Sequence, residues 1–222
     1  RKTKFMVVSR ENVDVRIFIA GKEIERVHSY KYLGTLLNDS WDCSQEVRAR
    51  IEQARGIFFK MRDLLCNRNL SLETRIRIVR CYVFPVLLYG HEGWTLTRAL
   101  EKKLEAFEMW VYRRMLKISW TDRVRNTDVL ARMKKEVEVL YEIKRRKLDY
   151  FGHVIRNEKY RLLQLVMEGK IEGKRKQGRR KTSWLKNLRD WFGVDSLGLF
   201  RAAVDKVKIC QMIANLRRGA GT

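Results

Sequence analysis

Apolar residues recur at helical spacing along most of this chain, beginning shortly after residue 42. In the first run they follow one another at steps of four and three: Val47, Ile51, Ala54, Phe58, Met61 and Leu65. Because side chains at this spacing share one face of an α-helix, the run predicts an amphipathic helix with one buried stripe. With 222 residues, 45% of them apolar, the chain can bury a sizeable core beneath such helices.

Further runs predict more helices. Ser71 starts a second helix that Pro85, the only proline, kinks or ends, and a third runs from about Thr97. A longer helical pattern leads to residue 155 and includes Leu140, Ile143, Leu148, Phe151 and Ile155. Thr182 or Ser183 caps the next helix, and a last helix is expected to turn these residues inward: Phe200, Ala203, Val207, Cys210 and Ile213.

The first forty residues follow a different pattern, rich in β-branched and aromatic side chains. The stretch "VDVRIFIAGKEIERVHSYKYLGTLL" contains a turn signal at Gly21-Lys22 and predicts a hairpin or small sheet. The fold class expected is therefore α+β and mostly α-helical. We divide it into a β-hairpin region at 1–40, a helical bundle at 41–95 and a basic helical region at 96–222.

The net charge limits the kinds of partner. Lys and Arg number 49 against 26 Asp and Glu, so the formal charge is +23, of which residues 151–222 carry +11. Such an excess favours a polyanionic partner, most simply nucleic acid. No apolar run reaches the roughly 18 residues that a membrane span needs, so no membrane partner is expected.

Several basic residues stand at positions suited to binding phosphates. Arg48, Arg55 and Arg62 recur every seven residues and are expected to line one edge of the first helix. The alternative is the solvated basic flank of an ordinary helix. Further along, "KRRK" at 144–147 is expected to cover a full helical turn with positive charge, with Arg145 and Arg146 as binding candidates.

A second basic cluster, "KRKQGRRK", occupies residues 174–181, directly after Gly173. Six of its eight positions are basic: Lys174, Arg175, Lys176, Arg179, Arg180 and Lys181. Its composition predicts a loop that acts as a nuclear-import signal, a nucleic-acid clamp or both. A nuclear location is therefore expected.

No self-contained active site is evident. Phosphoryl transfer with two Mg²⁺ ions needs clustered carboxylates, and the chain has no Asp-Asp pair, phosphate-binding Gly-rich loop, HExxH or CxxC. The His91-Glu92 pair is read as a structural histidine beside a surface carboxylate, because no third orienting group follows. The chain presents cations and aromatic rings instead, which suit a module that holds nucleic acid.

The order of several motifs resembles the C-terminal part of non-LTR retrotransposon reverse transcriptases. The resemblance covers nearly the whole chain. Its motifs are, in order, Lys2-Thr3-Lys4, "YKYLG" at 30–34, a basic helix, "LLYGHEGW" at 87–94, "FEMWVYRRMLKISWTDRVRN" at 107–126, "RRKLDYFGHVIR" at 145–156 and Gly178-Arg179-Arg180 before Trp184. Each string is short, and their shared order carries the resemblance. It implies the end of a polymerase palm at 1–40, a helical thumb at 41–95 and, at 96–222, a basic C-terminal region that binds RNA or target DNA.

The resemblance also implies roles for particular residues. Lys2 matches the polymerase motif D lysine, which can assist proton transfer to the leaving pyrophosphate. Tyr30, Tyr32 and Gly34 match the primer grip, where a glycine lets backbone pass close to the primer strand. The alternative is a hairpin whose tyrosine rings pack on the next helix. The basic helix that follows corresponds to a thumb that grips the template-primer duplex through its phosphates.

Two departures from the family limit what the resemblance implies. The catalytic aspartates, including the Tyr-x-Asp-Asp box, are absent here, so Mg²⁺ is expected only in a missing palm and this chain is not expected to polymerise alone. No Cys/His set matches the family's zinc knuckle either. The expected partners are an RNA template, a DNA primer or target duplex, and the rest of the polymerase polypeptide, since Arg1 suggests a piece of something longer. The alternatives are a stand-alone nucleic-acid-binding protein derived from such an element and a protein-interaction module.

Overall fold

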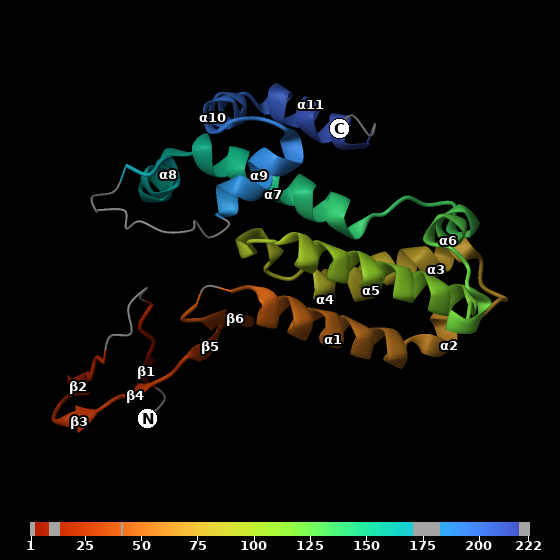
Figure 1. Ribbon diagram of the computed structural model, residues 1–222, viewed down its shortest axis with the longest axis horizontal. Coiled ribbons are helices and arrows are strands. Elements are labelled where there is room, and N and C mark those ends of the chain that lie inside the picture. The colour runs from red at the N-terminus through yellow and green to blue at the C-terminus, as the bar shows by residue number, and fades with distance from the viewer. Residues whose placement is uncertain (1–2, 9–13, 41, 171–182, 218–222) are drawn as a thin grey trace.

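Helices dominate the molecule, and short strands occupy its N-terminal part (Figure 1). The computed structural model describes residues 3–8, 14–40, 42–170 and 183–217. This arrangement confirms the expected mostly α-helical α+β fold with small sheets at the N-terminus.

The described strands form three separate two-stranded pairs. Their bounds are β1 (Lys4–Phe5), β2 (Phe18–Ile19), β3 (Lys22–Glu23), β4 (Glu25–Arg26), β5 (Ser29–Tyr32) and β6 (Thr35–Asn38). β1 pairs with β4 in parallel, whereas β2–β3 and β5–β6 are antiparallel hairpins. The first hairpin turns at Ala20-Gly21, both with positive φ, and not at the predicted Gly21-Lys22, because Lys22 already pairs with Ile19.

The first helical group follows β6 directly. It comprises α1 (Ser44–Lys60), α2 (Arg62–Leu65), α3 (Leu72–Ile78), the π-helix η1 (Val79–Val83), α4 (Phe84–Leu87), the 3₁₀ turn η2 (His91–Gly93) and α5 (Arg98–Leu116). The predicted stripe of α1 is buried at Val47, Ile51, Ala54 and Phe58. Ser71 and Thr97 cap α3 and α5 through their hydroxyl oxygens, which accept from Thr74 N and Leu100 N.

The second helical group runs from η3 to the C-terminal part. It comprises η3 (Trp120–Asp122), α6 (Asn126–Met133), α7 (Val139–Ile155), η4 (Glu158–Tyr160), α8 (Arg161–Glu168), α9 (Trp184–Phe192), α10 (Ser196–Val204) and α11 (Lys206–Arg217). Ser183 caps α9, as predicted.

The predicted single last helix is wrong. It divides at Asp205 into α10 and α11, and the Asp205 carboxylate accepts from Val207 N at 2.8 Å at the start of α11. The break rotates the second half, so Val207 and Cys210 are exposed and Ile209 is buried in their place.

Two hydrophobic clusters form the core. The larger joins buried residues from Val47 to Ile143 and therefore includes side chains on both sides of the predicted boundary at residue 95. The smaller gathers α7 with the C-terminal helices around these residues: Leu148, Phe151, Leu188, Leu199, Ala203 and Ile209. α7 contributes to both clusters. The division at 1–40, 41–95 and 96–222 stays a prediction.

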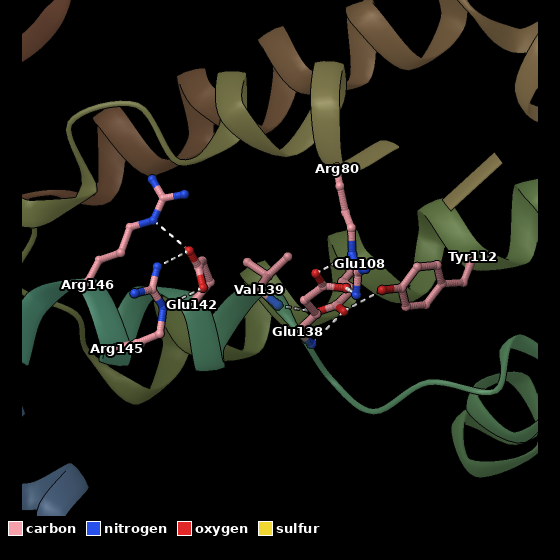
Figure 2. Close-up of polar contacts among 8 residues, drawn as sticks. All are labelled: Arg80, Glu108, Tyr112, Glu138, Val139, Glu142, Arg145 and Arg146. Atoms are coloured by element: carbon pink, nitrogen blue, oxygen red, sulfur yellow. Dashed lines mark hydrogen bonds and ion pairs between the residues drawn. The ribbon is translucent and has the colours of Figure 1, made fainter. Parts of the chain in front are cut away.

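A buried carboxylate fixes the start of α7 against α5. Glu108 on α5 accepts from the backbone N–H groups of Glu138 (2.7 Å) and Val139 (3.0 Å) and from the Tyr112 hydroxyl (2.8 Å) (Figure 2). Burial raises the pKa of Glu108 and that of Tyr112. Because the first N–H groups of a helix have no partner within it, this side chain supplies the cap that Glu138 does not.

Among the described residues, no helix is both long and apolar enough to cross a membrane.

Candidate nucleic-acid interface

The β5–β6 hairpin presents the two predicted tyrosines at the surface. Tyr30 and Tyr32 lie two residues apart, so they share one face of β5, and their residues are 45% and 57% exposed. Leu33 and Gly34 form the two-residue turn, both with positive φ (47° and 84°). This is the turn geometry that suits the twist of a tight hairpin.

Residues of the same chain hold this turn in place. The Arg50 guanidinium donates to the Gly34 carbonyl, and its Cζ lies 4.5 Å from the centroid of the Tyr89 ring. The Tyr89 hydroxyl donates to the Leu33 carbonyl at 2.8 Å. A Cβ added to Gly34 would lie 3.2 Å from the Tyr89 ring, so the close approach at this glycine is to Tyr89. Contact with a primer stays a prediction.

A buried ion pair connects the hairpin to α1. Glu46 Oε1 accepts from Arg50 Nε at 2.6 Å, and Glu46 Oε2 accepts from Leu36 N on β6 at 2.8 Å. Sequence reasoning did not single out this pair, although the i,i+4 spacing of Glu46 and Arg50 was a usable signal. The pair orients the tyrosine-bearing hairpin relative to α1.

The three predicted arginines of the first helix do not lie along one helix edge. Arg48 is exposed on α1, and Arg62 is exposed but lies beyond Met61, where α1 has ended and α2 begins. Arg55 is half-buried, donates to Glu52 at 2.8 Å and places its Cζ 5.2 Å from the Trp110 ring centroid. The expected single edge therefore holds only Arg48 and Arg55.

Arg145 and Arg146 on α7 are already paired with acids (Figure 2). Both donate to Glu142 at 2.7 Å, and Arg145 also donates to Asp149 at 2.9 Å. Hydrogen bonding from Arg145, with help from Arg146, lowers the pKa of Glu142 to about 2. Both guanidinium groups remain partly exposed, and their part in nucleic-acid binding stays a prediction.

The prediction that residues 144–147 form a full turn of surface charge is wrong, because Lys147 is completely buried. Its Nζ donates to Trp94 O at 2.6 Å and to Asn187 Oδ1 at 3.3 Å. It also lies 4.7 Å and 5.1 Å from the ring centroids of Trp184 and Trp191. Lys147 follows Ile143 by one turn, so it faces the core as Ile143 does.

Seven predicted site residues lie outside the described residues. They are Lys2, Lys174, Arg175, Lys176, Arg179, Arg180 and Lys181.

No metal centre is evident in the part of the chain that the structure describes, because no three His, Cys, Asp or Glu side chains gather there in a group that could hold an ion. His91 is buried, and its Nδ1–H donates to the Leu88 carbonyl. Burial lowers the pKa of His91. These features agree with a structural histidine.

Two curated proteins are similar to this chain. One, from Caenorhabditis elegans, is described as a putative uncharacterized transposon-derived protein and is 27% identical over 171 residues, which cover 75% of this chain and 61% of the relative. The other, described as the RNA-directed DNA polymerase from mobile element jockey of Drosophila funebris, is 26% identical over 129 residues, or 57% of this chain and 14% of the relative. The chain thus spans less than two thirds of either relative. No protein-family profile matches it. Nor does any solved structure.

Proposed function

We propose that this chain is the C-terminal part of a non-LTR retrotransposon RNA-directed DNA polymerase and that it grips the template and primer. In this proposal the β5–β6 hairpin and the exposed arginines of α1 and α2 contact nucleic acid. The catalytic aspartates and their Mg²⁺ ions belong to the part of the palm that is absent from this chain, so the isolated chain is not expected to polymerise.

The observation that carries the proposal is the similarity to the jockey RNA-directed DNA polymerase over 129 residues. Together with the transposon-derived relative, it supports a retrotransposon-derived origin. The net charge of +23 adds a physical reason for a polyanionic partner. Exposed side chains such as Arg48, Arg62, Tyr30 and Tyr32 supply both cations and rings at the surface.

Salt dependence tests the binding proposal. The purified chain is titrated into a fluorescein-labelled 20-base-pair duplex, and anisotropy gives the affinity at several salt concentrations. If six to ten phosphates are contacted, the affinity falls by about 10³ to 10⁵ between 50 and 200 mM salt. A flat salt response contradicts the proposal and favours a protein-interaction module.

A charge-reversal pair tests where the duplex binds. Arg48→Glu combined with Arg62→Glu is expected to weaken binding to all duplex sequences alike and to reduce the salt slope by about 2. The matched control, Lys206→Glu with Lys208→Glu, makes the same charge change on exposed residues of α11, far from α1 (Figure 1). Equal weakening in both pairs would mean that binding is diffuse and not centred on α1.

The six basic residues at 174–181 are proposed to direct the protein to the nucleus as well as to bind nucleic acid. Substituting all six with alanine is expected to move a fluorescent fusion from the nucleus to the cytoplasm. It is also expected to weaken duplex binding. An unchanged location excludes the import role, and unchanged affinity excludes the clamp.

A stand-alone nucleic-acid-binding protein is the second candidate, because one relative is itself described as transposon-derived. The two candidates differ in what precedes Arg1 in the coding frame. A Tyr-x-Asp-Asp box some tens of codons upstream supports the polymerase. A start codon with no such box supports the derived binding protein.

A further inference from the structure

An exposed aromatic ring lies where α1 and α5 pack together. Phe59 on α1 is 49% exposed, and its ring centroid lies 5.6 Å from that of Trp110 on α5 at an interplanar angle of 69°. The buried rings of Phe58 and Phe107 pack against Trp110, with centroids 5.0 Å and 5.7 Å away. Phe59 is therefore the outer member of a supported aromatic cluster and not a lone side chain in solvent.

Two guanidinium groups lie near the Trp110 ring, against which Phe59 packs. The Cζ atoms of Arg55 and Arg114 lie 5.2 Å and 5.7 Å from the Trp110 ring centroid, within the range of cation–π attraction. Arg55 precedes Phe59 by one turn of α1, and Arg114 follows Trp110 by one turn of α5. Each helix thus contributes one aromatic residue and one arginine to the same surface.

The helix dipoles explain only part of this arrangement. α1 and α5 end on the same side of the molecule, since Cys66 Sγ, just after α2, lies 3.4 Å from Arg114 O. Basic residues in the last turns, such as Lys60 and Arg114, offset the partial negative charge of helix C-termini. Arg55 lies before the last turn, however, and a dipole gives no reason to expose Phe59.

We infer that Phe59, Trp110, Arg55 and Arg114, here called the Phe59 surface, bind single-stranded nucleic acid by stacking an unpaired base on Phe59. In this inference Arg55 and Arg114, both near the Trp110 ring, contact phosphates of the same strand. The inference rests on the proposed function and narrows its partner. In a duplex each base is already stacked between its neighbours, so only a single strand can offer a base to the ring.

The experiment compares two oligonucleotides with the same number of phosphates. One is a fluorescein-labelled dT12, and the other is a 12-mer in which every base is replaced by an abasic tetrahydrofuran residue. The full chain is expected to bind dT12 at least about 5-fold more tightly, because stacking of one base contributes a factor of roughly 5 to 150. Equal affinities for the two probes would overturn the inference without any variant.

Variants assign the effect to the ring. Phe59→Ala is expected to reduce the preference for dT12 over the abasic strand to near unity, whereas Phe59→Tyr keeps a ring and keeps the preference. The matched control is Leu64→Ala, which removes a similarly exposed apolar side chain, 48% exposed, on neighbouring α2. Loss of the preference in the Leu64 variant, or its retention in Phe59→Ala, rejects the Phe59 surface as the stacking site.

The results also separate this inference from the proposed function. If neither duplex nor single strand binds at low salt, both are wrong. If the duplex binds with the expected salt dependence but the two 12-mers bind alike, only the stacking inference is wrong.

Discussion

Lys147 carries an amine that the fold removes from water. Burial lowers its pKa to about 7, well below the ordinary lysine value of about 10.4. Two acceptors, Trp94 O and Asn187 Oδ1, and the faces of two tryptophans surround the nitrogen. These contacts support the charged form, but burial removes its hydration and has the larger effect, so the neutral amine is favoured more in the folded protein than in the unfolded chain.

This shift predicts a pH dependence of stability. Between about pH 7 and pH 10.4 the unfolded chain holds a proton that the folded protein has released, so the free energy of unfolding rises with pH. From pH 7.0 to 8.5 the rise attributable to Lys147 is about 1–2 kcal/mol. Urea denaturation of wild type and Lys147→Met at both pH values measures it as a difference. An equal pH response in the two proteins contradicts the assignment.

Gly34 is a second residue whose environment predicts a mutational effect. Alanine there would need a positive φ and would bring its Cβ within 3.2 Å of the Tyr89 ring. Gly34→Ala is therefore expected to lower the free energy of unfolding by about 1–2 kcal/mol. Gly56→Ala, in open space on α1, serves as the control and is expected to raise it by about 0.5–1 kcal/mol. Chemical denaturation measures both, and the same sign in both variants would be inconsistent with the turn geometry.

At the scale of elements, α7 depends on a carboxylate from another helix. Glu108→Ala is expected to lower the free energy of unfolding by about 2–4 kcal/mol, because it leaves two helix N–H groups and the Tyr112 hydroxyl without an acceptor. Urea denaturation followed by circular dichroism measures the change.

Glu105→Ala, on the same helix, is the control for this cap and is expected to change stability by less than about 0.5 kcal/mol. A Glu108 variant as stable as the Glu105 variant would show that water or another group caps α7.

The helices were predictable from sequence where a stripe and a cap agreed. Ser71, Thr97 and Ser183 were readable as caps because their hydroxyls precede apolar runs. The break at Asp205 was not, since the apolar residues before and after it could be joined into one pattern. Neither was the cap from Glu108, which depends on contact between residues about thirty apart.

The candidate site was less predictable, because charge along the chain does not reveal which way a side chain points. Arg48 and Arg62 are exposed as expected, but Arg55 lies against Trp110 and Lys147 is buried. Lys147 could have been assigned to the core from its place one turn after Ile143 and one turn before Phe151. The contacts of Arg50 with Gly34 and Tyr89 required the fold itself.

At the scale of the whole molecule, α9 joins the smaller cluster to the larger one. Asn187 Oδ1 accepts from Leu96 N at 2.8 Å, and Asn187 Nδ2 donates to Leu96 O at 2.7 Å. Both polar groups of this side chain therefore bind the backbone of a single residue. On either side of it, Trp184 Nε1 donates to Glu92 O and Trp191 Nε1 to Glu101 Oε1, each at 2.6 Å.

Removing the Asn187 side-chain amide should loosen the contact between α9 and residues 92–101. Asn187→Ala is expected to speed hydrogen exchange in α9 and at Leu96, because it leaves both backbone groups of Leu96 buried without partners. Mass spectrometry of peptides from 92–101 and 184–192 measures the effect. Asp190→Ala, an exposed change on the same helix, should leave exchange unaltered. Faster exchange in the Asp190 variant but not in the Asn187 variant would show that Asn187 does not hold α9 against residues 92–101.

Because α7 contributes to both hydrophobic clusters, recombination between related sequences should not be tolerated equally at every position in and beside this helix. The buried residues of the larger cluster end at Ile143 and those of the smaller cluster begin at Leu148, so a recombination crossover between these two positions takes the buried residues of each cluster from one parent. A crossover in the stretch from 134 to 138, between α6 and α7, would instead bring Val139, Leu140 and Ile143 of one parent into the larger cluster of the other. Exchange between related chains should therefore be tolerated more often within residues 144–147.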